Sequence, residues 1–111
     1  MKSVRSKYGS VKTTVSGRIF DSKQEALRYR ELQLLERVGK ITDLECQREF
    51  VLISKSEYGR AIKYRCDFAY RQDGRFTVED VKSPTTAKHP VYRLKKRLMA
   101  EVYGIEIREV A

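Results

Sequence analysis

The segment from residue 61 to residue 82 most constrains what this chain can fold into. Apolar and polar side chains alternate over residues 61–70, Gln72-Asp73-Gly74 follows, and a second strand-like run covers residues 75–82. Period-two alternation is typical of a half-buried strand, and Asp-Gly between two such runs is a strong signal for a hairpin turn. The sequence therefore predicts an antiparallel hairpin. One face of its first strand would carry Ile62, Tyr64, Cys66 and Phe68, and the other Lys63, Arg65 and Asp67.

Two helices are expected on either side of this hairpin in the sequence. The first should begin at Asp21-Ser22 and run to about Val38, with Gly39 as its C-terminal cap. Its main apolar stripe would be Leu27, Leu34, Leu35 and Val38, widened by Ala26 and Leu32. The second helix should follow a loop at residues 83–90 and end at Gly104. Its stripe would be Val91, Leu94, Leu98 and Val102.

The remaining segments are short. Residues 12–15 and 18–20 flank Ser16-Gly17 as a small leading hairpin, residues 44–53 form one or two strands, and Tyr58-Gly59 marks a turn. Ile105 and Ile107 would close the chain as a strand. The order after the leading hairpin is a helix, three strands, a helix and a strand, which predicts one mixed α/β domain over residues 1–111. Residues 1–10 are expected to form a flexible basic arm.

The chain is strongly basic, with 24 Lys and Arg against 15 Asp and Glu, a net charge of +9. The residues before Asp21 contain no carboxylate, and neither does the segment from Lys82 to Arg97. Such acid-free segments favour a polyanionic partner, bound through its backbone and weakened steeply by salt. The candidate nucleic-acid contacts are Lys7, Lys12, Arg93, Lys95 and Lys96. The alternative is a set of solvated surface cations with no such partner.

Other composition features exclude several classes of protein. The chain has no apolar run near the roughly 18 residues that a membrane helix needs, and its basic N-terminus lacks the apolar region of a secretory signal. Cys46, Cys66 and the single His89 lack metal-ligand spacing, so a zinc site is not expected. Two buried free thiols in a reducing cytoplasm are the simplest interpretation of the cysteines.

Val78-Glu79-Asp80-Val81-Lys82 carries the sharpest functional hypothesis. Val78 and Val81 mark a strand, so Asp80 and Lys82 project from the same face. A carboxylate beside an ammonium can hold a divalent metal next to a water molecule, and Asp67 could supply a second carboxylate if the strand register brings it near. A metal held by oxygen ligands, Mg²⁺ or Mn²⁺, suits phosphodiester hydrolysis. The alternative is a charge pair on a solvated strand face.

Three further carboxylates are possible ligands. Glu79 points away from Asp80 if the strand is regular, although a bulge would exchange the two. Glu25 lies in the first turn of the first helix, where Ser22-Lys23-Gln24-Glu25 also fits a capping box. Glu31 lies closer to the expected apolar stripe and is an alternative ligand from the same helix.

Four segments together resemble the PD-(D/E)XK nucleases, and within them small phage-type endonucleases described as Holliday-junction-resolvase-like. They are residues 20–26, residues 64–68, residues 78–82 and residues 92–96, within a resemblance that covers about residues 8–110. By this resemblance Asp67 is the first motif aspartate, Asp80 the second acidic ligand, Lys82 the motif lysine and Glu25 the acidic residue of the first core helix. Cys66 departs from the family pattern, because it stands where the motif name has proline.

The resemblance implies an αβββαβ restriction-endonuclease-like core, with a central mixed sheet flanked by helices. It implies a Mg²⁺-dependent DNA endonuclease that acts on branched DNA, in the cytoplasm of a bacterial host if the protein is phage-encoded. Symmetric cutting of two strands would require a homodimer. The alternatives are a nicking or repair-type nuclease on duplex DNA and a non-catalytic DNA-binding accessory protein with the same fold.

Overall fold

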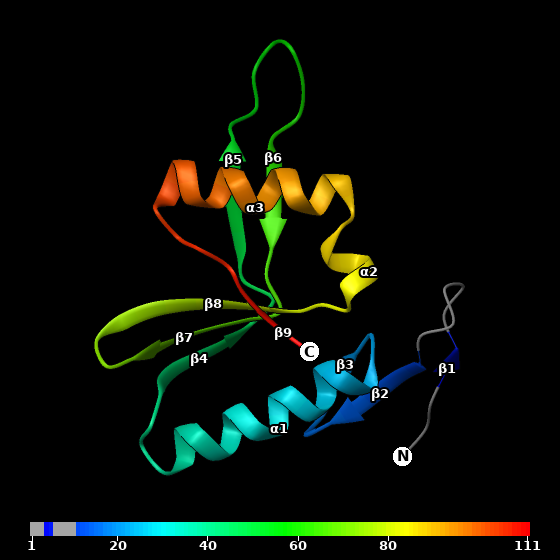
Figure 1. Cartoon of the computed structure of the whole chain (residues 1–111), viewed down its shortest axis with the longest axis vertical. Helices are drawn as coiled ribbons and strands as arrows, with labels where there is room; N and C mark the ends of the chain where they lie inside the picture. Colours follow the sequence, from blue (N-terminus) through cyan, green and yellow to red (C-terminus); the bar gives the residue numbers. More distant parts are fainter. Residues whose placement is uncertain (1–3, 6–10) are drawn as a thin grey trace.

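The structure is a computed structural model that describes residues 4–5 and 11–111 (Figure 1). The elements in chain order are β1 Val4–Arg5, β2 Val11–Val15, β3 Arg18–Phe20, α1 Lys23–Arg37, β4 Thr42–Cys46, β5 Glu49–Ile53, β6 Ile62–Arg65, β7 Phe68–Gln72, β8 Arg75–Val81, α2 Pro84–Ala87, α3 Pro90–Tyr103 and β9 Arg108–Val110. The expected basic arm falls mostly on residues outside the described range, except that Val4–Arg5 pairs with β2.

The central sheet has the strand order β4-β7-β8-β9. β4, β7 and β8 pair antiparallel, whereas β8 and β9 run parallel, so the sheet is mixed. The predicted hairpin forms between β7 and β8, and its turn residues Asp73 and Gly74 both have positive φ, 52° and 76°. That geometry matches the twist of the flanking strands. The mixed α/β class and this hairpin are confirmed.

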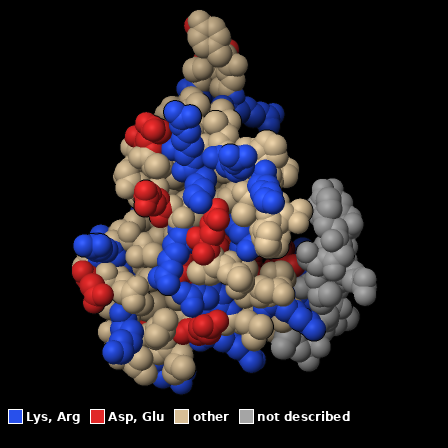
Figure 2. Space-filling model, in the orientation of Figure 1, with Lys and Arg blue, Asp and Glu red and all other residues tan. Residues whose placement is uncertain are grey.

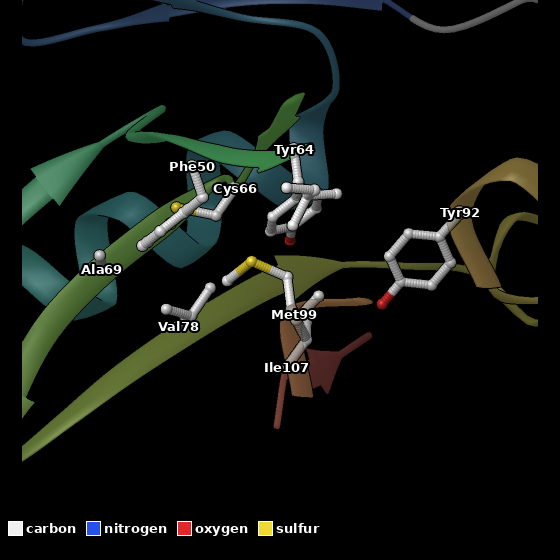
Figure 3. Close-up of a cluster of buried hydrophobic side chains, with 9 residues drawn as sticks. Phe50, Tyr64, Cys66, Ala69, Val78, Tyr92, Met99 and Ile107 are labelled. Atoms are coloured by element: carbon white, nitrogen blue, oxygen red, sulfur yellow. The ribbon is translucent and has the colours of Figure 1, made fainter. Parts of the chain in front are cut away.

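Helices cover the two faces of the central sheet (Figure 1). On one face α1 and the β2–β3 hairpin bury a first apolar cluster, the α1-side core: Val15, Phe20, Ala26, Tyr29, Leu32, Ile41, Phe68 and Tyr70. On the other face α3 and the separate β5–β6 hairpin bury the α3-side core: Phe50, Leu52, Tyr64, Cys66, Ala69, Val78, Tyr92, Met99 and Ile107 (Figure 3). Adjacent residues such as Phe68 and Ala69 therefore point into different cores, as strand alternation requires.

The single strand expected over residues 61–70 is wrong. The chain forms two strands, β6 and β7, which belong to different sheets and are separated by Cys66 and Asp67. Phe68 consequently enters the α1-side core, while Tyr64 and Cys66 enter the α3-side core. A period-two pattern shows which side chains alternate but not where a strand changes partner. The segment of residues 44–53, expected to form one or two strands, contributes to two, β4 and β5, and these lie in different sheets in the same way.

The apolar stripe predicted for the first helix is only partly right, although the limits of the helix are nearly as predicted. Ala26 and Leu32 are buried and Leu35 packs against the core. α1 buries Ala26, Tyr29 and Leu32, whereas Leu27, Leu34 and Val38 are more than half exposed. Tyr29 stacks on Phe68 with ring centroids 6.1 Å apart. The side of α1 that faces the sheet is centred on Tyr29, an aromatic residue that the predicted stripe of aliphatic residues leaves out.

The second helix shows the same kind of error. α3 buries Tyr92 and Met99, while the expected stripe residues Val91, Leu94 and Val102 are exposed and Leu98 is only partly buried. Its end at Gly104, with φ +67°, is as predicted. The expected loop at residues 83–90 contains the short helix α2, capped at Ser83, and the last strand begins at Arg108, after Ile107 has entered the core.

Two smaller features concern the leading hairpin and the thiols. β2 and β3 pair as predicted around Ser16 and Gly17, which both have positive φ. Cys66 is buried, but Cys46 is only half-buried, and both are free thiols. None of the helices in the described part of the chain is long and apolar enough to cross a membrane.

Candidate active site

Asp80 lies near the end of β8, and Lys82, just after the strand, approaches it as the strand pattern predicts. The Lys82 Nζ atom is 3.8 Å from Asp80 Oδ2. Asp80 is only 2% exposed, and its carboxylate accepts hydrogen bonds from the Tyr64 hydroxyl and from the Asp67 backbone N–H. The register of β7 and β8 is continuous across this region, so the bulge that would exchange Asp80 and Glu79 is not present.

Asp67 lies beside Asp80 because of the break between β6 and β7. The pairing of Phe68 with Glu79 places Asp67 opposite Asp80 in the extended ladder. Its N–H donates to Asp80 Oδ1 at 2.9 Å, and its Oδ2 accepts from the Val81 N–H at 2.8 Å. These two hydrogen bonds replace strand pairing at this point. The site therefore depends on the same break that the strand prediction missed.

Glu25 reaches Asp67 from the first turn of α1. Ser22 caps the helix by accepting from the Glu25 N–H at 3.1 Å, which fixes where the helix begins. The Glu25 and Asp67 carboxyl groups lie close enough for each to shift the pKa of the other. Glu31, the alternative on the same helix, is exposed and pairs with Arg28 at 3.4 Å instead.

Glu79 points to the opposite face of the sheet and belongs to a buried ion pair. It is fully buried, and the Arg28 guanidinium donates to its two oxygens at 2.8 Å and 2.7 Å. The Tyr70 hydroxyl donates to the same carboxylate. Because Arg28 follows Glu25 by one helical turn, this pair fixes the rotation of α1 and so the position of Glu25. Sequence reasoning missed Arg28 and Tyr70; the spacing of Arg28 from Glu25 was the available signal.

An open cavity of about 440 Å³ lies in front of Asp67, Asp80 and Lys82. It is lined by β6, β8, α2 and α3 residues, among them Arg65, Thr86, His89, Tyr92 and Lys95. Lys82 Nζ lies 4.3 Å from the centroid of the Tyr92 ring, while the Tyr92 hydroxyl donates to Glu109 at 2.8 Å. The Lys82 ammonium is thus held between a carboxylate and an aromatic face at the edge of the cavity.

The pKa values of the three carboxyl groups are raised. Burial and, after it, the neighbouring Glu25 carboxylate together raise the pKa of Asp67 to about 7. Burial raises the pKa of Asp80 to about 6, with the Asp67 charge as the next cause. The pKa of Glu25 is also raised, mainly by burial. Asp67 and Asp80 line this cavity, while Glu25 lines a neighbouring one that Lys82 shares. Three carboxyl groups so close together are a poor arrangement for stability and a good one for a cation.

Asp67→Asn should stabilise the protein above pH 7 and change little at pH 5. A carboxyl group whose pKa is raised on folding binds more protons in the folded than in the unfolded state between pH 4 and 7, so its contribution to stability falls as pH rises through that window. The amide keeps an oxygen for the Val81 N–H. A gain on the order of 1 kcal/mol would raise Tm by about 4–8 °C.

The measurement is thermal unfolding followed by circular dichroism at pH 5 and pH 8. Asp73→Asn is the matched control, because Asp73 lies in the exposed β7–β8 turn at a positive φ that Asn accepts. A variant that is less stable than the parent chain at pH 8 would contradict this view of the site.

The donor set fits Mg²⁺ or Mn²⁺ in its chemistry. Glu25, Asp67 and Asp80 offer only hard oxygen ligands, and each Asp80 oxygen accepts a single hydrogen bond, which leaves lone pairs for a cation. Among the described residues, no three Asp, Glu, His or Cys side chains are arranged to hold an ion as they stand. The contacts are pairwise, from Glu25 to Asp67 and from Asp67 to Asp80.

The candidate DNA contacts fall in different places. Lys95 lines the site cavity, whereas Arg93 and Lys96 line another open cavity of about 560 Å³, where Lys96 pairs with Glu109 at 2.9 Å. Lys12 lies 3.8 Å from Asp21, and Lys7 is outside the described residues. Figure 2 shows Lys and Arg side chains spread over the face of the molecule seen in Figure 1, with Asp and Glu side chains between them. The DNA-binding roles stay predictions.

The comparison with protein families matches residues 5–109 to a family described as "Protein of unknown function (DUF1064)". The comparisons with curated proteins and with solved structures gave no significant match. The family match spans α1, the central sheet and α3, and so includes every side chain of the candidate site.

Proposed function

We propose that this chain, which belongs to the DUF1064 family, is a metal-dependent DNA endonuclease that hydrolyses phosphodiester bonds. One observation carries the proposal. Asp67, Asp80 and Lys82 meet at the edge of one cavity, and Glu25 reaches Asp67 from α1. Three segments that are distant in the sequence supply these four groups. The three carboxyl groups repel one another, which lowers the stability of the fold, so their proximity calls for a functional explanation. The raised carboxyl pKa values support the same interpretation.

Each residue has a definite part in the proposed reaction. Glu25, Asp67 and Asp80 would hold Mg²⁺, which supplies a water of lowered pKa and neutralises phosphate charge when bound. Lys82 lies beside Asp80 and would orient the attacking water or stabilise the charge that develops on the phosphate. Tyr64 and the Asp67 N–H keep the Asp80 carboxylate in place. Burial raises the pKa of Tyr64, so it remains a neutral donor.

The order of the elements supports a PD-(D/E)XK-type core. α1 is followed by β4, β7 and β8, then by α3 and β9, with the β5–β6 hairpin inserted after β4. Those six elements have the expected αβββαβ order, and the four strands form the central mixed sheet. This agreement and the proximity of Glu25 to Asp67 support the nuclease proposal over a charge pair on a solvated strand.

The proposed substrate is DNA, held mainly through its backbone. The net charge of +9 favours a polyanion, and Arg65, Lys82 and Lys95 line the cavity that contains the carboxylates. Branched DNA is the preferred form, and a homodimer is proposed because cutting two strands symmetrically needs two sites. The experiment must distinguish cleavage of branched DNA from nicking of duplex DNA and from DNA binding without cleavage.

Asp80→Asn should abolish cleavage. The test incubates the parent chain and the variant with supercoiled plasmid, linear duplex and a synthetic four-way junction, in Mg²⁺, Mn²⁺ or EDTA. We expect cleavage by the parent chain only with metal, and a loss of at least 10²-fold in the variant, because Asp80 is the most buried of the proposed ligands. Linear plasmid formed without a nicked intermediate would indicate paired cutting.

Asp73→Asn is the control, since it makes the same chemical change in an exposed turn. DNA binding without cleavage in either metal would contradict the enzyme proposal and favour the alternative, a non-catalytic DNA-binding accessory protein. Equal cleavage of linear duplex and junction would contradict the branched-DNA preference while keeping the nuclease.

A further inference from the structure

The β5–β6 hairpin forms an arm that projects beyond α3 (Figure 1). Its base is anchored, because Phe50, Leu52 and Tyr64 pack into the α3-side core. Its outer part, residues 53–60, is exposed throughout. The two strands pair with each other and, in the described chain, with no strand of the central sheet. Such an arm adds little to the core beyond its base, so its length needs another explanation.

Tyr58 is at the tip of this arm and is 92% exposed. Ser56 and Gly59 exchange two backbone hydrogen bonds, at 3.0 Å and 3.2 Å, and the Ser56 hydroxyl accepts from the Tyr58 N–H at 3.1 Å. The turn is therefore closed by Ser56 and Gly59 and does not use the Tyr58 ring. Small polar residues are the usual choice in such a position. A large aromatic ring held in solvent on a tight turn is available to a partner.

Cations lead from this tip to the candidate active site. Lys55 and Arg60 flank the turn, and Lys63 and Arg65 follow on β6; all four are exposed. Arg65 lines the cavity that contains Asp67 and Asp80. Glu57, beside Tyr58, is the one carboxylate in residues 55–65. The extended chain from Tyr58 to Arg65 spans roughly 20 Å, the length of several nucleotides.

We propose that Tyr58 stacks on an unpaired base of branched DNA, while Lys55, Arg60, Lys63 and Arg65 contact the phosphates that lead from the branch to the site. This inference rests on the proposed nuclease function and names its substrate class, DNA in which a base is unstacked. An exposed ring next to cations is how proteins hold unpaired bases without reading their sequence. A protein partner would favour an apolar tip, whereas Lys55 and Arg60 flank this one.

The test measures DNA binding in EDTA, where no cleavage is expected. Fluorescence anisotropy would follow the parent chain, Tyr58→Ala and Tyr58→Phe on a splayed fork and on a duplex of the same length. Loss of base stacking should weaken fork binding by Tyr58→Ala about 5- to 150-fold and leave duplex binding within about twofold. Tyr58→Phe, which keeps the ring, should bind like the parent chain. Leu27→Ala, an exposed apolar change on α1, is the matched control.

A second readout places 2-aminopurine at the fork, where stacking on Tyr58 should quench its fluorescence in the parent chain and not in Tyr58→Ala. Equal binding of fork and duplex by the parent chain, or equal loss on both in Tyr58→Ala, would overturn the inference. If metal-dependent cleavage persists in that case, the nuclease proposal stands without it. Failure of the parent chain to bind either DNA would overturn both.

Discussion

Arg28→Met should destabilise the protein by about 3–5 kcal/mol, a large part of the 5–15 kcal/mol typical of a domain. The change leaves the fully buried Glu79 carboxylate without its two guanidinium hydrogen bonds. Tyr70 would remain as a donor but carries no charge. The hydrogen bond to Glu79 also raises the pKa of Arg28, which shows that the pair stabilises its charged form. Urea unfolding monitored by circular dichroism measures the loss.

A combined variant separates an unpaired buried charge from lost packing. Arg28→Met, Glu79→Leu and Tyr70→Phe together remove the three polar groups that meet at the buried Glu79 carboxylate, and such replacements are often close to neutral. We expect the triple variant to recover most of the stability that Arg28→Met loses. Arg30→Met, on an exposed position of α1, is the control. If Arg28→Met alone were as stable as the parent chain, the ion pair between Arg28 and Glu79 would not be what holds α1 on the sheet.

The parts of the fold that the sequence predicts correctly are set by local chemistry. The β7–β8 turn needs two residues that accept positive φ, and Asp73-Gly74 provides them. The common face of Asp80 and Lys82 follows from strand geometry alone. The limits of α1 follow from Ser22 at its start and Gly39, with φ +80°, just after its end. None of these features depends on a distant segment.

The errors arise where distant residues decide. Leu27 and Leu34 form an apolar stripe as good as the buried one. The side of α1 that faces the sheet is selected by distant partners: Tyr29 packs on Phe68, and Arg28 pairs with Glu79, 51 residues later. Asp67 shows the same limit. Its position opposite Asp80 depends on the change of strand partner after Arg65. The alternation of apolar and polar residues continues through that change, so the sequence pattern does not reveal it.

The candidate site combines both kinds of feature. Asp80 and Lys82 could be placed from one strand, whereas Glu25 needed the resemblance, because the sequence alone left it equal to Glu31. The structure separates these two by placing Glu25 against Asp67 and Glu31 in solvent. Tyr64 was counted only as an apolar strand residue, although its hydroxyl donates to Asp80. A buried tyrosine opposite an expected ligand is the signal that could have identified it.

Lys82→Met should lower the rate of DNA cleavage about 10²- to 10³-fold while leaving metal binding intact. Removal of one donor that stabilises transition-state charge has an effect of this size. Lys82 is not among the proposed ligands, and its ammonium lies 3.8 Å from Asp80 Oδ2, so its loss should not weaken the binding of a cation. We expect Mg²⁺ to raise the Tm of the parent chain, and this rise should persist in Lys82→Met and disappear in Asp80→Asn.

Single-turnover cleavage with saturating enzyme measures the chemical step apart from DNA binding, and thermal unfolding with and without Mg²⁺ measures the metal. Lys88→Met is the matched control, because Lys88 is an exposed cation just after α2. Lys82→Arg keeps the charge but replaces a compact ammonium with a planar group, so only partial activity is expected. A Lys82→Met enzyme that cleaves at the parent rate would remove Lys82 from the mechanism. Parallel loss of the rate and of the Mg²⁺ effect would instead give Lys82 a role in forming the metal site.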